Sequence, residues 1–110
     1  MKYPDYTNSI VNISCSILKY YGVKDLKHNS IPELDSILKK RKPKNLILLL
    51  FDAMGISILK QHISPNSFLR THILKTVSST FPPTTTAATT SINSGLTPYE
   101  SGWLGWISYF

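Results

Sequence analysis

The sequence reads NLILLLFD from Asn45 to Asp52 and TFPPTTTAATTS from Thr80 to Ser91. The first stretch is a continuous apolar run that is short for a helix, so it predicts a strand that ends in a carboxylate. Its lack of alternation predicts a strand covered on both faces, as in a parallel sheet. Ligands of open α/β sheets bind at the carboxyl ends of strands, which makes Asp52 a candidate binding residue. Capping of the following helix would also explain this carboxylate.

The second stretch predicts a helix from Thr84 to Asn93. Pro82 and Pro83 exclude an earlier helix start, and Gly95 provides a C-terminal stop. Five of the seven residues from 84 to 90 are Thr, which is a poor helix former because it loses rotamer freedom. Either packing of the Thr methyl groups on a sheet or chemistry at the first turn would explain this composition.

Two helices are predicted before these stretches. Apolar residues at a spacing of three and four predict a helix over residues 7–21, with Thr7 or Asn8 as the cap and Gly22 after its end. Cys15 falls on another face of this helix. The expected inward stripe consists of Ile10, Ile13, Ile17, Leu18 and Tyr21.

The pattern Ser30-Ile31-Pro32-Glu33 is typical of a capping box and predicts a helix over residues 31–41. The cations of the run KKRKPK, residues 39–44, complement the negative end of that helix. A nucleic-acid patch is the alternative interpretation of this run. No aromatic residues are interleaved as stacking platforms, so no specific nucleic-acid partner is expected.

Further along the chain, the pattern predicts a helix over residues 56–63, a short helical turn over 67–72 and a second strand over 73–79. A loop with two Trp residues follows over residues 95–106, and the opening of another strand over 107–110. His62 and His72 are expected to be polar surface residues, and they lack the spacing of a metal-binding pair, so neither is expected to be a ligand. The same is expected of His28, which lies in a polar loop.

Length and composition limit the class of protein. The chain has 110 residues, a formal net charge of +6 and one Cys, so at most one small domain and no internal disulfide are expected. The longest apolar run is too short for a bilayer, which requires roughly 20 residues. The expectation is a cytoplasmic protein without a membrane partner, and its oligomeric state is open.

The two stretches together suggest chemistry at phosphorus. A Thr hydroxyl at a helix start lies beside backbone N–H groups that favour a phosphate. A divalent ion bound to that hydroxyl and to a strand-end carboxylate would favour the alkoxide and polarise a phosphoryl oxygen. The prediction is therefore that a Thr at this helix start attacks in line and that this Thr and Asp52 share the ion.

At these residues, and at Ser94-Gly95-Leu96-Thr97-Pro98, the sequence resembles the alkaline phosphatase superfamily, especially its nucleotide pyrophosphatase/phosphodiesterase-like branch. The resemblance implies an α/β three-layer sandwich with a mainly parallel sheet, two Zn²⁺ ions and hydrolysis of phosphate esters or diesters, with a phosphorylated small molecule or a nucleotide as substrate. In relatives the nucleophile lies ten positions before a Gly, which gives Thr85 here. Thr84 and Thr86 are the alternatives.

The chain also departs from this family. Ser101-Gly102 stands where many relatives have His-Gly, and their further Asp and His ligands lie well beyond this length. The expectation is an N-terminal helical segment over residues 1–44, followed by the N-terminal part of an incomplete α/β domain over residues 45–110. The alternative is a non-catalytic shortened paralogue that binds a partner or an anion.

Overall fold

A computed structural model of the chain describes residues 3–107. Over these residues the chain forms six helices and one isolated parallel bridge, between Ser9 and Ser78. The contacts divide the chain into two units. The first combines Met1–Lys42 with Val77–Phe110, and the second is Pro43–Thr76. The division into an N-terminal helical segment and an α/β domain, with its boundary between residues 44 and 45, stays a prediction.

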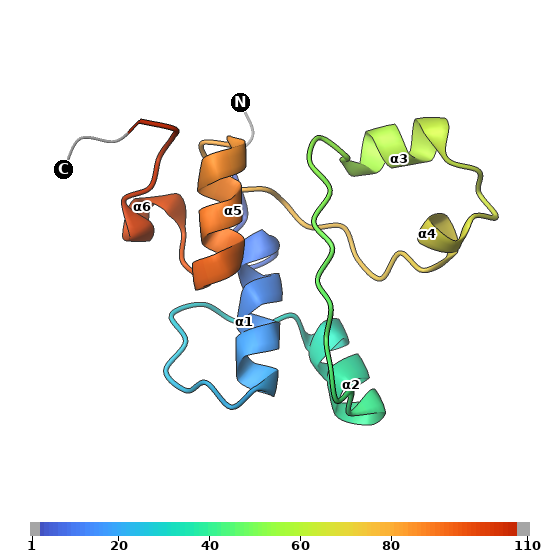
Figure 1. The fold of residues 1–110 in the computed structure, drawn as a ribbon, viewed down its shortest axis with the longest axis horizontal. Helices are drawn as coiled ribbons and strands as arrows, with labels where there is room; N and C mark the ends of the chain where they lie inside the picture. The colour runs from blue at the N-terminus through green and yellow to red at the C-terminus, as the bar shows by residue number, and fades with distance from the viewer. Residues whose placement is uncertain (1–2, 108–110) are drawn as a thin grey trace. The chain divides into compact units, whose positions relative to one another are not determined.

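The first unit contains α1 (Ile10–Tyr20), α2 (Pro32–Arg41), α5 (Thr85–Ser94) and α6 (Pro98–Ser101). Helix α1 packs against both α2 and α5, and α5 packs against α6 (Figure 1). Two segments that are far apart in the sequence therefore form one unit. The bridge between Ser9 and Ser78 holds them together as well, because the backbone N–H of Ile10 donates to the carbonyl of Ser78 and that of Ser78 to the carbonyl of Asn8.

The core of the first unit is small and rich in polar side chains. Its buried apolar residues are Val11, Cys15, Ile31, Leu38 and Ala87. The amide of Asn12, which is fully buried, accepts from the backbone and the hydroxyl of Ser9 and donates to the carbonyl of Asn29. Buried polar groups are tolerated when they are hydrogen-bonded in this way.

The second unit contains α3 (Ile56–His62) and α4 (Phe68–Thr71), and neither helix has a buried residue. The guanidinium of Arg70 donates to the carbonyls of Lys60 and Ile63 at 3.3 and 3.0 Å, which ties α4 to the end of α3. Hydrogen bonds thus contribute to the local order of this unit, and its helices add no fully buried side chain to a core.

The predicted α/β fold with a parallel sheet is wrong: the structure is helical and contains no sheet over the described residues. Residues 46–51 are extended but unpaired, and of residues 73–79 only Ser78 forms a bridge. A strand is stabilised by the neighbour that pairs with its backbone. A short apolar run in the sequence indicates that burial of its side chains is favoured. It does not indicate that another strand is present to pair with its backbone.

The helix predictions fared better. Helices lie within the segments predicted over residues 7–21, 31–41, 56–63 and 67–72, and α5 begins one residue after the predicted start at Thr84. The caps were only partly right. Ser9 caps α1 in place of Thr7 or Asn8, in a capping box with Asn12. Ser30 does not cap α2, because its hydroxyl donates to Asp35 instead.

The inward face predicted for α1 was also wrong. Val11 and Cys15 are buried at 0% and 1% exposure, whereas Tyr21 is 58% exposed. The remaining predicted residues are half-buried. The reason is that α1 lies between two helices and therefore buries two faces. The hydroxyl of Ser14 donates to the carbonyl of Ile92 on α5, and that of Ser16 accepts from the backbone N–H of Ile31 before α2. Every helix within the described residues is too short or too polar to cross a bilayer.

Candidate functional site

The Thr-rich segment forms the first turns of α5. Thr84 is the N-cap, and its hydroxyl accepts from the backbone N–H of Ala87 at 3.4 Å. Thr85 is the first helical residue and is exposed. No acidic residue lies in this first turn, so no carboxylate there offsets the partial positive charge of the helix start. The Thr84 hydroxyl is therefore engaged in capping, whereas Thr85 lies at an accessible position.

The tolerance of α5 for so many Thr residues has a local explanation. The hydroxyl of Thr89 donates to the carbonyls of Thr85 and Thr86 at 2.7 and 3.2 Å, and that of Ser94 donates to the carbonyl of Thr90 at 2.7 Å. Such bonds to the preceding turn satisfy hydroxyl groups within a helix. The helix ends at Gly95, as predicted.

Two hydroxyls of α5 remain without a hydrogen bond although their oxygens are buried. They belong to Thr86, the third candidate nucleophile, and to Ser91, which is fully buried. A buried hydroxyl without a partner costs roughly 1–3 kcal/mol. The burial of its hydroxyl oxygen makes Thr86 a poorer nucleophile candidate than the exposed Thr85.

Asp52 lies in a turn of the second unit and is exposed. Its carboxylate accepts from the backbone N–H of Ala53 at 2.9 Å, and Ala53 has a φ of +54°. The expected capping role is not observed, because α3 begins at Ile56 after an N-cap at Gly55 that makes no side-chain bond. Asp52 belongs to the second unit and Thr85 to the first.

The three His residues divide into two kinds. His62 and His72 are exposed, as predicted. The side chain of His28 is only 18% exposed, and its Nε2 lies 2.7 Å from Oε2 of Glu100. Among the described residues, no group of three or more His, Cys, Asp or Glu side chains is placed to hold a metal ion.

Glu100 makes a set of side-chain interactions that the sequence analysis did not predict. Its carboxylate interacts with His28 and also accepts from the backbone N–H and hydroxyl of Thr97, which form a capping box at the start of α6. The interaction with His28 lowers the pKa of Glu100 most; the bonds from Thr97 also lower it and burial opposes them, so that the pKa is about 2. Thr97-Pro98-Tyr99-Glu100 is a cap signature that could have been read in the sequence.

Comparison with family models, with curated proteins and with solved structures found no match for this chain. A function for this chain is therefore inferred from its own residues and from the resemblance of their sequence pattern to the alkaline phosphatase superfamily.

Proposed function

We propose that this protein acts on phosphate esters or diesters, with the hydroxyl of Thr85 as the nucleophile and Asp52 as a ligand of a divalent ion, Zn²⁺ by resemblance. The observation that carries the proposal is the exposed Thr85 at the first position of a ten-residue helix whose first turn has no acidic residue. A phosphate is favoured at such a helix start. The substrate is a phosphorylated small molecule or a nucleotide.

The residues present do not by themselves complete a zinc site. A catalytic zinc has about three protein ligands, and Asp52 and Thr85 supply two donor groups. Among residues 3–107, no group of three His, Cys, Asp or Glu side chains could add the rest. The proposal for this chain is therefore limited to the roles of Thr85 and Asp52.

Thr85 would form a bond from its Oγ to phosphorus while the bond to the leaving oxygen breaks. Water would then hydrolyse the resulting phosphothreonine or nucleotidyl-threonine. We place this activity in the cytoplasm, because the one cysteine, Cys15, is a buried free thiol and such thiols are typical of a reducing compartment.

The test compares Thr85→Ala with Thr85→Ser in hydrolysis of bis(p-nitrophenyl) phosphate at a series of zinc concentrations. We expect Thr85→Ala to lower the rate of turnover at least about a hundredfold and to form no covalent intermediate. Thr85→Ser should retain both turnover and the intermediate. Asp52→Asn should weaken zinc binding measured by calorimetry, whereas Asp25→Asn, which removes an exposed carboxylate elsewhere, should not.

A second candidate function is non-catalytic binding of an anion or a partner. The exposed start of α5 without acidic residues favours it as well. Zinc calorimetry and turnover separate the two candidates: turnover that depends on both zinc and Thr85 would exclude the second. Turnover that survives Thr85→Ala would place the nucleophile elsewhere and contradict the first.

A further inference from the structure

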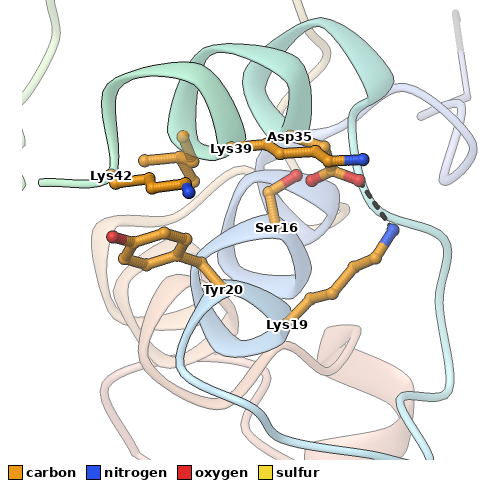
Figure 2. A pocket seen from close by; sticks show the side chains of 7 residues that line it. Ser16, Lys19, Tyr20, Asp35, Lys39 and Lys42 are labelled. Atoms are coloured by element: carbon orange, nitrogen blue, oxygen red, sulfur yellow. Dashed lines mark hydrogen bonds and ion pairs between the residues drawn. The ribbon is translucent and has the colours of Figure 1, made fainter.

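A cavity of about 470 Å³ lies between α1 and α2, within the first unit. Its volume is within the range of small-molecule sites, roughly 300–1,000 Å³. Figure 2 shows that α1 contributes Ser16, Lys19 and Tyr20, that α2 contributes Asp35 and Lys39, and that Lys42 lies directly after α2. Leu38 adds a buried apolar side chain to the lining. The walls therefore combine an apolar surface with an aromatic ring and several charges.

The polar side of the cavity contains an unsatisfied acceptor. Oδ2 of Asp35 accepts from Nζ of Lys19 at 2.8 Å and from the hydroxyl of Ser30 at 2.6 Å. Oδ1 is buried and has no hydrogen-bond partner. Burial is the largest influence and opposes ionisation, but the interactions with Lys19, Ser30 and Ser16 together outweigh it and lower the pKa of Asp35. The carboxylate is therefore an acceptor at neutral pH. Because the Asp35 side chain is 22% exposed and lines the cavity, a donor from a ligand can approach its carboxylate there.

The cationic side is not neutralised by the protein. Lys19 is paired with Asp35, whereas among the described residues neither Lys39 nor Lys42 has a carboxylate partner. Lys42 follows the end of α2 and lies near Tyr20 at one end of the cavity, with the pair Lys19–Asp35 towards the other (Figure 2). An anionic group is therefore favoured near Lys42 and a donor near Asp35.

We propose that this cavity binds a small phosphorylated compound with a flat, amino-bearing ring, the chemistry that a nucleoside monophosphate presents. Its phosphate would lie near Lys42, its ring against Leu38 and Tyr20, and its amino group at the carboxylate of Asp35. The proposal is independent of Thr85 and Asp52, because every residue that lines the cavity lies between positions 16 and 42.

The test is calorimetric titration of the whole chain with AMP, and with adenosine, ribose 5-phosphate and inorganic phosphate as probes of its parts. We expect AMP to bind with one-to-one stoichiometry and each part to bind at least about tenfold more weakly. Lys42→Gln should weaken AMP binding by about tenfold. Lys40→Gln is the matched control, because Lys40 is exposed on the same helix, does not line the cavity and gives the same change in net charge.

Three outcomes would overturn the proposal: AMP fails to saturate the protein, inorganic phosphate binds as tightly as AMP, or Lys40→Gln weakens binding as much as Lys42→Gln. The last outcome would indicate general attraction to a basic surface. Binding that is unchanged in Thr85→Ala but weaker in Lys42→Gln assigns the ligand to this cavity, whatever becomes of the proposed hydrolysis. Circular dichroism of each variant is the control that checks whether the fold is retained.

Discussion

Gly95 shows how one residue fixes the packing of two helices. It ends α5 with a φ of +69°, in the left-handed region that side chains disfavour. A Cβ atom at this position would lie 3.2 Å from Cδ1 of Leu18 and 3.6 Å from Sγ of Cys15, both on α1. The residue therefore allows both the turn and the close approach of the end of α5 to α1.

We expect Gly95→Ala to lower the free energy of unfolding by roughly 1–3 kcal/mol, because it adds backbone strain and a steric conflict with Leu18. Urea denaturation measures this change. Gly105→Ala is the control, since a Cβ there would meet no atom within 4 Å. Equal stability of the two variants would mean that Leu18 and the turn adjust at little cost.

The sequence was informative about Gly95 as a helix stop, because Gly after a periodic segment is a local signal. It could not indicate that Gly95 contacts α1, because that contact joins residues about 80 positions apart in the chain. The same limit applies to Cys15. Periodicity placed it away from the inward face, whereas packing of α1 against two helices buried it.

At the scale of elements, α6 is a four-residue helix that side chains connect to a distant loop. Its capping box joins Thr97 to Glu100, and Glu100 also meets His28 at 2.7 Å. A helix this short has little stability of its own. These side-chain interactions therefore contribute to holding α6 in place.

This arrangement predicts a dependence of stability on pH. The folded pKa of Glu100 is about 2, below its ordinary value of 4.5. Its contribution is then fully present above about pH 4.5 and is lost as the pH falls through about 2. We expect the difference in unfolding free energy between the wild type and Glu100→Gln to shrink over this interval, measured by urea denaturation at each pH. A difference in unfolding free energy that stays constant down to pH 2 would contradict the lowered pKa of Glu100 in the folded state.

Helices were easier to predict than strands in this chain for a physical reason. A helix satisfies its hydrogen bonds within one segment, so periodicity and caps suffice to find α1, α2 and α5. The capping box of α6, Thr97 with Glu100, is a further local signal of the same kind. A strand depends on a neighbouring strand that pairs with its backbone. For residues 46–51, such a neighbour was expected only from their apolar character and from the family resemblance. The candidate site has the same weakness, because Asp52 was placed at the end of that strand.

At the scale of the whole chain, the second unit contains a continuous run of exposed apolar side chains over residues 47–51. Ile47 and Leu49 are 82% and 71% exposed, and Leu48, Leu50 and Phe51 are each about half exposed. An extended apolar run with unpaired backbone groups and no internal charge can pair with another chain. The net charge of +6 opposes association, because like-charged chains repel each other.

We therefore expect the protein to self-associate with increasing concentration, and more strongly as salt screens the repulsion. Sedimentation velocity across a concentration series at low and high salt measures this. The double variant Ile47→Lys/Leu49→Lys should remain monomeric at concentrations where the wild type associates, because it places charges within the run.

Tyr99→Lys is the control, since Tyr99 is 92% exposed on α6 in the first unit. A monomeric wild type at high concentration and high salt would show that this run does not drive association. Association that Tyr99→Lys abolishes equally would place the contact in the first unit.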